Sequence, residues 1–351
     1  MTGILGLTWD HPRGRDALQA AAFPGLDWDV HSLEGFESSP IEELAERYDL
    51  IVLDHPHLGD ALAADCLRPL DEVFAPEELR AWAAGSVGPS ASSYLLDGRT
   101  WALPLDAATQ VSARRPDLLP TAPRTWEEAL ALDVPVAPSL AGPHAFLTFC
   151  SIAVSLGGDL GDDFFARAIA EQALSILAEL ADGAADATHA MNPIALLEHM
   201  SSTDELAYIP LVYGYVTYSP RVAFGAPPSG ARVGSTIGGT GIALSRRSSP
   251  EPRLLDHLRW LMSPEAQSGF IPAHSGQPSA RSAWTDPVVD AAAGGFYSGT
   301  LDTIEHSWVR PRFAGYIPFQ SEASAIVRDG LARPASATAA RLATAYREAR
   351  S

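Results

Sequence analysis

Two near-copies of one short motif bring histidine and aspartate side chains to two places in the chain. The first reads Trp9-Asp10-His11-Pro12-Arg13-Gly14, and the second reads Asp54-His55-Pro56-His57-Leu58-Gly59. Each follows a short apolar run, at residues 3–7 and 50–53, as expected for parallel strands that are covered on both faces. Ligands of open α/β sheets bind beyond the carboxyl ends of the strands. The pattern therefore predicts two loops that project into one cleft.

Several kinds of chemistry are open to Asp10, His11, Asp54, His55 and His57. As an acid–base set they would use imidazoles, which titrate near neutral pH, and carboxylates that orient them. His55 and His57 would share a face of an extended segment and could hold a metal ion with His11 or Asp54. We assign no metal, because a full site needs three or four ligands and supporting partners. These side chains could also contact an organic ligand, or they could be structural, with the aspartates capping the loops and the histidines bonding to the backbone.

Aromatic and cationic side chains elsewhere extend the candidate site. Tyr213 and Tyr215 lie two residues apart in a strand-like run, a spacing that places both rings on one face. Trp308 and Arg310 lie in one segment that mixes stacking and cationic groups. Arg13 and Arg310 could each bind a carboxylate or phosphate through two parallel hydrogen bonds. Aromatic walls suit a sugar or another ring-bearing ligand.

The composition excludes several function classes. The formal net charge is −19 over 351 residues, which argues against nucleic acid and anionic membrane surfaces, since both need a basic footprint. All 24 basic residues are arginine, so Schiff-base lysine chemistry and a Walker A lysine are excluded. No apolar stretch is long enough to span a bilayer. Cys66 and Cys150 lie in apolar patterns typical of inert thiols.

The elements that position these residues begin with an alternation of strands and helices, which favours a parallel sheet. In the first third of the chain we expect strands at 4–8, 27–31 and 50–53 and helices at 13–22, 41–47 and 76–84. We also expect a hairpin turn at 97–100, strands at 101–105, 208–218 and 241–245, helices at 145–156, 162–181 and 252–262, and a helical tail at 323–350.

Three further stretches carry a family resemblance. Residues 97–106 read Asp-Gly-Arg-Thr-Trp-Ala-Leu-Pro-Leu-Asp and precede Pro-Arg-Thr-Trp-Glu-Glu-Ala at 123–129; residues 238–245 read Gly-Gly-Thr-Gly-Ile-Ala-Leu-Ser; and residues 258–267 end in Ser-Pro-Glu-Ala-Gln. In this order they resemble a hairpin, a glycine-led return strand and a helix end of the extracellular solute-binding proteins of ABC transporters, the group that includes maltose-binding protein. Together they span most of the chain.

The resemblance implies an α/β, two-lobed type II periplasmic-binding-protein-like fold, with hinge crossings between lobes that close on a ligand. Lobe one would take residues 1–108 plus 241–300, and lobe two residues 109–240 plus 301–351. Crossings near 106–110 and 238–241 would add Asp106 and Thr240 to the site. The full set of expected ligand-binding residues is Trp9, Asp10, His11, Arg13, Asp54, His55, His57, Asp106, Tyr213, Tyr215, Thr240, Trp308 and Arg310.

We therefore expect a protein that binds a small polar or ring-bearing organic metabolite between its lobes. The alternative is an enzyme in the same cleft, cofactor-independent or metal-assisted, in which Asp10, His11, Asp54, His55 and His57 do acid–base chemistry. We expect no cofactor, no nucleic-acid partner and no membrane insertion. The first strand follows the start of the sequence almost directly, without an export signal. Unless such a signal was removed, this predicts a cytoplasmic location and argues against a permease partner.

Overall fold

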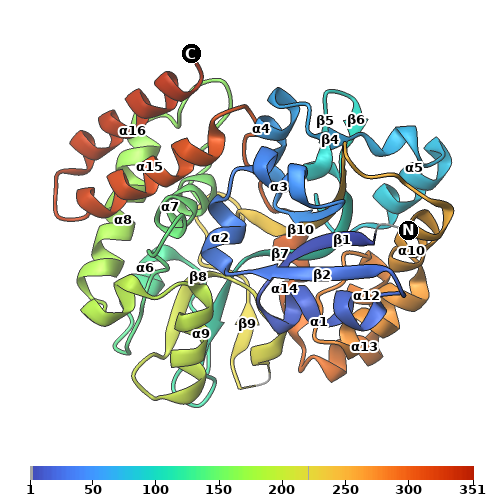
Figure 1. Ribbon diagram of the computed structural model, residues 1–351. Helices are drawn as coiled ribbons and strands as arrows, with labels where there is room; N and C mark the ends of the chain where they lie inside the picture. The colour runs from blue at the N-terminus through green and yellow to red at the C-terminus, as the bar shows by residue number, and fades with distance from the viewer. Residues whose placement is uncertain (1–2, 220) are drawn as a thin grey trace. The chain divides into compact units, whose positions relative to one another are not determined.

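The computed structural model describes residues 3–219 and 221–351, and the chain divides into two compact units (Figure 1). Unit 1 contains Met1–Ala108, Gly238–Ala292 and Arg312–Tyr316. Unit 2 contains Thr109–Ile237, Ala293–Pro311 and Ile317–Ser351. The chain therefore passes repeatedly between the units, and each unit is assembled from segments far apart in the sequence.

These units can be set beside the lobes expected from the sequence. The chain leaves unit 1 after Ala108, at the end of the first expected segment. It returns at Gly238 rather than at residue 241, and residues 293–300 lie in unit 2 rather than in the first lobe. The short segment Arg312–Tyr316 belongs to unit 1, whereas the sequence placed it in the second lobe.

Unit 1 is built on a sheet with the strand order β2-β1-β3-β10-β7. Its strands are β1 (Ile4–Trp9), β2 (Leu26–His31), β3 (Leu50–Leu53), β10 (Ile237–Ser245) and β7 (Leu103–Arg114). β1 pairs in parallel with both β2 and β3, whereas β10 runs antiparallel to β3. This confirms the predicted βαβ order. Because β1 and β3 are parallel neighbours, the two Asp-His-Pro motifs follow strands that end at the same edge of the sheet.

The helices of unit 1 begin where local sequence signals place them. They include α1 (Pro12–Ala21), α2 (Leu33–Ser38), α3 (Ile41–Arg47), α4 (Leu58–Ala63), α5 (Pro76–Gly85), α10 (Pro252–Leu261), α11 (Ile271–Ala273), α12 (Arg281–Trp284) and α13 (Pro287–Ala292). Helices α1, α5 and α10 each start with a proline, whose fixed φ suits the first turn and whose missing N–H costs nothing there. The predicted helices at 13–22, 41–47, 76–84 and 252–262 are thereby confirmed to within one residue at each end.

The predicted hairpin turn is also present. β5 (Leu95–Leu96) pairs with β6 (Arg99–Thr100), and the two residues between them, Asp97 and Gly98, have φ values of 53° and 74°. Positive φ at both central residues is the requirement of a two-residue type I′ turn. The strand expected at 101–105 begins only at Leu103, because the main chain of Trp101 bonds back to Tyr94 at 3.0 Å.

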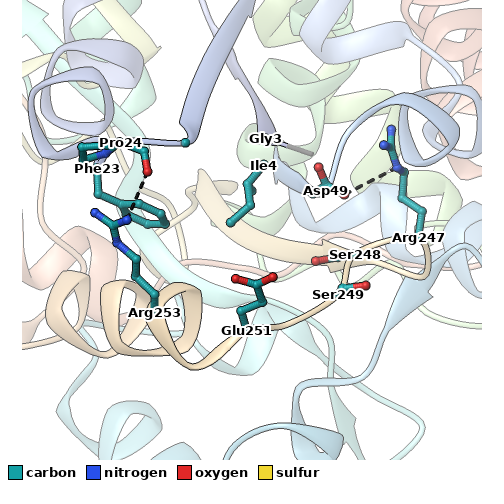
Figure 2. Close-up of a pocket in the computed structure, with 11 residues that line it drawn as sticks. Gly3, Ile4, Phe23, Pro24, Asp49, Arg247, Ser248, Ser249, Glu251 and Arg253 are labelled. Atoms are coloured by element: carbon teal, nitrogen blue, oxygen red, sulfur yellow. Dashed lines mark hydrogen bonds and ion pairs between the residues drawn. The ribbon is translucent and has the colours of Figure 1, made fainter. Parts of the chain in front are cut away.

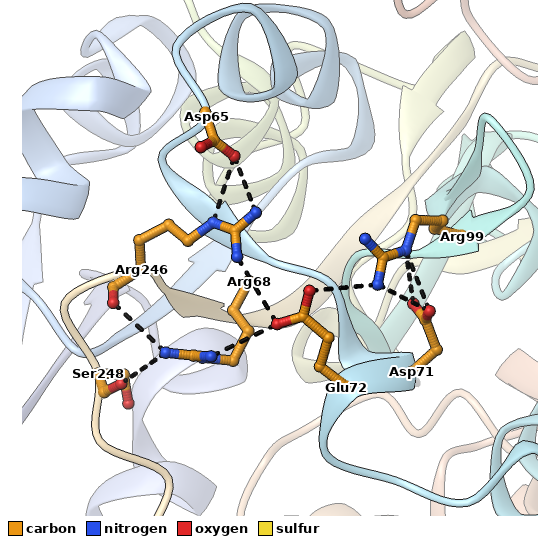
Figure 3. Close-up of polar contacts among 7 residues, drawn as sticks. All are labelled: Asp65, Arg68, Asp71, Glu72, Arg99, Arg246 and Ser248. Atoms are coloured by element: carbon orange, nitrogen blue, oxygen red, sulfur yellow. Dashed lines mark hydrogen bonds and ion pairs between the residues drawn. The ribbon is translucent and has the colours of Figure 1, made fainter.

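A network of ion pairs joins the loop around β4 (Leu67–Arg68) to the end of β10 in unit 1 (Figure 3). Arg246 pairs with Asp65 at 2.9 Å and with Glu72 at 3.6 Å. Arg99 pairs with the same Glu72 at 3.3 Å and with Asp71 at 2.8 Å. These side chains are exposed to solvent, so each pair adds little stability alone, but the shared carboxylate links three segments.

Unit 2 packs its helices around a smaller antiparallel group of strands. The second half of β7 pairs with β8 (Tyr208–Tyr213) and with β9 (Ala223–Gly225). Its helices include α6 (Trp126–Leu130), α7 (His144–Ser155), α8 (Arg167–Asp182), α9 (Pro193–Ser202), α14 (Phe296–Glu305), α15 (Tyr316–Gly330) and α16 (Ala335–Ala349). Helix α14 belongs here because it packs on β9, where the rings of Phe224 and Phe296 are 5.2 Å apart.

Two expectations in unit 2 need correction. The helix expected from residue 162 begins at Arg167, because Phe164 and Phe165 turn into an aromatic cluster around Phe149 instead of continuing the helix. The strand expected over 208–218 ends at Tyr213 and is followed by a short 3₁₀ helix at Val216–Tyr218. The helical tail expected at 323–350 is present as the end of α15 and as α16, which starts after the N-cap residue Pro334.

Both cysteines lie in apolar surroundings, as expected. Cys150 is fully buried in α7, which raises its pKa. Burial also raises the pKa of Cys66 to about 11. Both thiols are free, and a raised pKa disfavours the reactive thiolate. Among the residues described, no helix combines the length and apolar character needed to cross a membrane.

Candidate functional site

The first Asp-His-Pro motif forms a tight turn at the carboxyl end of β1. His11 is the N-cap residue of α1, and its Nδ1 accepts a hydrogen bond from the backbone N–H of Arg13 at 3.1 Å. The imidazole of His11 stacks on the indole of Trp9, with ring centroids 5.4 Å apart and planes 11° from parallel. The loop is therefore closely packed, and the indole of Trp9 holds the His11 ring by stacking on it.

The long side chain of Arg13 leaves this turn and reaches Asp106 on β7. Its Nε donates to Asp106 Oδ1 at 2.8 Å, and its Nη2 donates to Asp106 Oδ2 at 2.6 Å. The guanidinium carbon also lies 5.6 Å from the ring centroid of Trp9. Both partners are buried, with 6% of Arg13 and 7% of Asp106 exposed. A two-pronged pair of this kind fixes the direction of both groups, because the planar guanidinium matches the carboxylate.

The charge state of His11 follows from the same surroundings. Burial, followed by the positive charges of Arg13 and Arg15, lowers the pKa of His11 to about 4. The ring is therefore neutral near pH 7, as its role as a hydrogen-bond acceptor requires. Asp10 of the same motif points outward, where it is exposed and forms an ion pair with Arg15.

The return strand β10 passes close to Asp106. Gly239 has a φ of 83°, and a Cβ at this position would collide with the carbonyl oxygen of Asp106 and with Ala107. The glycine-led stretch at 238–241 thus permits a close approach that other residues would block. Thr240 and Gln277 line a small cavity with Arg13 and Asp106, about 20 Å³ in volume, which is room for about one water molecule.

The second motif has a different environment. Asp54 caps a short 3₁₀ helix at His55–His57 by accepting from the backbone N–H of His55 at 2.9 Å. Its Oδ1 also lies 3.0 Å from His55 Nδ1. Both histidines are buried, and the ring of His55 meets the ring of Tyr94 edge-on at 6.3 Å. The expected extended segment is thus wrong here, because the proline and the aspartate cap start a helical turn, and the two imidazoles do not share a strand face.

The structure offers no assembled metal site at these loops. Within residues 3–219 and 221–351, no group of three or more histidine, cysteine, aspartate or glutamate side chains is placed to hold a metal ion. The structural role considered for the motifs is present in part, since Asp54 and His11 both cap helical turns.

The remaining expected residues lie in unit 2. Tyr213 meets the ring of His144 edge-on at 5.9 Å, whereas Tyr215 meets Tyr218 at 6.4 Å. β8 ends at Tyr213, and Tyr215 keeps an extended backbone just before the following 3₁₀ helix. The two rings have these different aromatic neighbours, and their shared face stays a prediction from the sequence.

Trp308 and Arg310 lie on an extended segment beside residues 235–237 of unit 2. The backbone N–H of Trp308 donates to the Ser235 carbonyl oxygen at 2.7 Å. Arg310 is buried, and its Nη1 donates to Gln320 Oε1 at 3.1 Å while its Nη2 donates to the Ile237 carbonyl oxygen at 3.4 Å. The two residues are spaced by two along this segment, which places them on one side of it.

Comparisons with known proteins bear on the fold. No protein-family model matches the chain, and no curated protein sequence matches it. A solute-binding protein of an ABC transporter from Agrobacterium radiobacter K84, in complex with ribitol, is 20% identical with a TM-score of 0.82 over 99% of this chain and 98% of that one. Maltose-bound MalE3 of T. maritima is 17% identical with a TM-score of 0.81 over 99% of each chain. UgpB from Mycobacterium tuberculosis, in complex with glycerophosphocholine, is 16% identical with a TM-score of 0.77 over 100% of this chain and 98% of that one.

The chain has the fold of ABC transporter solute-binding proteins. This confirms the resemblance drawn from the hairpin, the return strand and the helix end, and with it the α/β type II binding-protein fold. The likeness extends over nearly the full length of both chains in each pair.

Within this solute-binding fold, unit 1 brings five of the expected residues into one group. These residues are Trp9, His11, Arg13, Asp106 and Thr240. Asp54, His55 and His57 lie at the neighbouring strand end, where the two histidines are buried in the core and Asp54 is partly buried. Sequence reasoning missed Gln277, which lines the small cavity with Asp106 but has no motif around it.

A larger cavity in unit 1 lies at the other end of the strands (Figure 2). It has a volume of about 240 Å³ and is lined by the start of β1 together with Asp49, Arg247, Glu251 and Arg253. Its arginines are already engaged: Arg253 donates to the Pro24 carbonyl oxygen at 3.1 Å, and Arg247 lies 3.5 Å from Asp49. This cavity is separate from the group at the carboxyl ends of β1 and β3.

Proposed function

We propose that the protein binds a small polar organic ligand, of the size and polarity of a polyol or a sugar, and that the Asp106 and Arg13 side chains of unit 1 contribute to binding. The observation that carries this proposal is the solute-binding fold over 99% of the chain. Its relatives in that fold are recorded with ribitol, maltose and glycerophosphocholine, all of them small molecules rich in hydroxyl or charged oxygen groups.

The chemistry of the unit 1 group agrees with such a ligand. The Asp106 carboxylate accepts hydrogen bonds and the Arg13 guanidinium donates them, so together they can serve both sides of a hydroxyl group. Because each holds the other in place, neither has to be ordered when a ligand arrives. The Trp9 ring contacts the Arg13 guanidinium and stacks on the His11 ring. Its role in this proposal is to hold the Arg13 side chain in place against Asp106.

Thermal unfolding in the presence of ribitol, maltose and glycerophosphocholine tests the proposal. A ligand that binds only the folded state stabilises it by about 2.7 kcal/mol at a hundredfold excess over its Kd, and calorimetric titration then gives the Kd. Asp106→Asn should weaken binding by about 10- to 100-fold, because a hydrogen bond to a charged group is lost. Asp71→Asn changes an exposed carboxylate in the surface network of unit 1 and should leave the Kd unchanged.

Two results would contradict the proposal. One is the absence of any stabilisation or heat of binding across a wider panel of polyols, sugars and their phosphodiesters. The other is binding that survives Asp106→Asn with the Kd of the wild type. Circular dichroism of each variant shows whether the fold is retained, so that loss of binding is not confused with unfolding.

The enzyme hypothesis, the location in the cytoplasm and the question of a permease stay predictions from the sequence. For the enzyme hypothesis, the lowered pKa of His11 keeps that ring neutral and makes it a weak base. His55 and His57 are held in the core beneath their own helical turn. We therefore place ligand binding ahead of acid–base chemistry.

A further inference from the structure

A short extended segment, Gln277–Ala280, runs beside the first residues of β7 in unit 1. The backbone N–H of Ala107 donates to the Gln277 carbonyl oxygen at 3.2 Å, and the side-chain amide of Gln277 donates back to the Ala107 carbonyl oxygen at 3.0 Å. Asp106 itself forms an antiparallel bridge with Pro278. The direction of the Asp106 side chain is thus set partly by this segment, which belongs to no regular strand.

The side chain of Gln267 fastens the same segment to the preceding helical turn. Its Oε1 accepts from the backbone N–H groups of Ser279 at 2.8 Å and Ala280 at 2.9 Å, and its Nε2 donates to the Leu261 carbonyl oxygen at 2.8 Å. The hydroxyl of Ser279 donates in turn to the carbonyl oxygen of Pro104 on β7. Gln267 is fully buried, so water cannot take over these bonds when the side chain is changed.

We propose that Gln267 is a positioning residue for the Asp106 carboxylate: it holds the segment Gln277–Ala280 against β7 and so keeps Asp106 aligned with Arg13. Gln267 bonds to Ser279, whose hydroxyl bonds to Pro104 two residues before Asp106. The same segment begins at Gln277, which bonds to Ala107 directly after Asp106. The inference rests on the proposed function only in making Asp106 a ligand-binding group. The alignment with Arg13 is a property of the protein without ligand.

The chemistry of the amide explains why glutamine suits this position. It has to accept two backbone N–H bonds through one oxygen and donate to a carbonyl oxygen from the same group, which a carboxamide does without charge and without needing a bound proton. Methionine has nearly the same length but offers neither, and would leave the N–H groups of Ser279 and Ala280 buried without partners. Gln267 also lies in a π-helical turn, Ala266–Phe270, a distortion that is frequent at functional sites.

A double-mutant cycle measures the alignment directly. Urea unfolding of the wild type, Arg13→Met, Asp106→Asn and the double variant gives the coupling between the two side chains as a ratio of unfolding equilibrium constants. The cycle is then repeated in a Gln267→Met background. We expect the coupling ratio to fall about tenfold there, because the carboxylate no longer meets the guanidinium in its two-pronged geometry. Gln267→Glu keeps an acceptor for Ser279 and Ala280 and should restore part of the coupling.

The control background is Thr148→Val. The buried Thr148 hydroxyl donates to the Ser139 carbonyl oxygen at 2.9 Å in unit 2, so this change also removes a buried side-chain bond, but one that is not among the bonds linking Gln267 to β7. It should lower stability and leave the coupling ratio unchanged. A Gln267→Met background that lowers stability with the coupling ratio intact would overturn the proposal and leave Gln267 a purely structural residue.

If Gln267→Met does not fold, Ser279→Ala provides a second test, since it removes the hydroxyl bonds to Pro104 and to Gln267 Oε1 and keeps the two backbone bonds to Gln267. The coupling ratio should then fall by about threefold, with faster hydrogen exchange at the Ala107 amide. Unchanged coupling together with unchanged exchange would again contradict the proposal. None of these measurements uses a ligand, so a failure to find a ligand counts against the proposed function and not against this inference.

Discussion

In the first Asp-His-Pro motif the aspartate, Asp10, is exposed and pairs with Arg15, whereas in the second motif Asp54 is partly buried and caps the main chain of His55. The histidines differ in the opposite sense. His11 uses its ring to cap α1, while the ring of His55 lies in the core against Tyr94. The capping role has thus passed from the histidine in one copy to the aspartate in the other, although the two sequences match at both positions.

The residue after the proline decides what each loop can do next. Arg13 is long enough to cross from α1 to Asp106 on β7, whereas His57 at the equivalent position is short and stays buried. The glycines differ as well. Gly14 makes room for the indole of Trp9, and Gly59 makes room for the backbone of Phe313. One loop therefore presents a charged pair, and the other anchors a distant segment of unit 1.

The largest effect expected from this comparison is the loss of Arg13. Arg13→Met leaves the Asp106 carboxylate buried without its main cation and should lower the free energy of unfolding by about 3–5 kcal/mol. Arg15→Met, on the same helix, removes solvent-accessible pairs with Asp10 and Asp16 and should change stability by less than about 0.5 kcal/mol. Urea unfolding of both variants measures the difference. Equal losses in the two would show that the buried pair does not distinguish the first loop.

The second prediction concerns pH. The pKa of His11 is about 4 in the folded protein and about 6.5 when unperturbed. Between these values the unfolded chain binds more protons, so stability falls as pH drops from 6.5 to 4 and is fully present above 6.5. The loss attributable to His11 is about 3 kcal/mol, since each pKa unit corresponds to about 1.4 kcal/mol. His11→Asn keeps an N-cap side chain but cannot titrate, and should flatten this decline in unfolding experiments across the pH range.

His257 needs a matching variant, because burial lowers its pKa to about 4 as well. His257→Phe should remove a decline of similar sign, and the two variants together should remove more than either alone. An undiminished decline in His11→Asn would mean that the ring is not held neutral by its surroundings.

The third prediction tests the anchoring role of the second loop. A Cβ at Gly59 would meet the backbone carbonyl group of Phe313, which cannot rotate away as a side chain does. Gly59→Ala should therefore lower the free energy of unfolding by about 1–3 kcal/mol through overpacking. Gly85→Ala, at the end of α5, meets no neighbouring atom and should be neutral or slightly stabilising. A tolerated Gly59→Ala would indicate that Arg312–Tyr316 packs less closely on α4.

The smallest effect expected is the loss of the cap in the second motif. Asp54→Ala removes the bond to the His55 N–H and should cost about 1 kcal/mol in the free energy of unfolding. If Asp54 has no part in binding, the Kd for any ligand found should be unchanged. A loss of affinity with little loss of stability would instead show that the second loop takes part in ligand binding.

Much of this structure follows from local sequence signals. Short apolar runs place β1 and β3, prolines at the first turn start α1, α5 and α10, and the Asp97-Gly98 pair closes a type I′ turn because both residues adopt positive φ. These are interactions between residues close in the chain, so their physics is readable from the order of residue types. The two polar loops lie at the same edge of the sheet because they follow β1 and β3, which run parallel.

Only the tertiary structure decided which polar groups meet. Arg13 and Asp106 are 93 positions apart, and nothing near either residue specifies the other. The bonds from Gln267 to the segment Gln277–Ala280 and the seat of Phe313 on Gly59 also join separate parts of the chain. Such partners depend on strand order and on which side chains are long enough to bridge the resulting gap. That is why two nearly identical motifs, both visible in the sequence, became a charged pair in one place and a core anchor in the other.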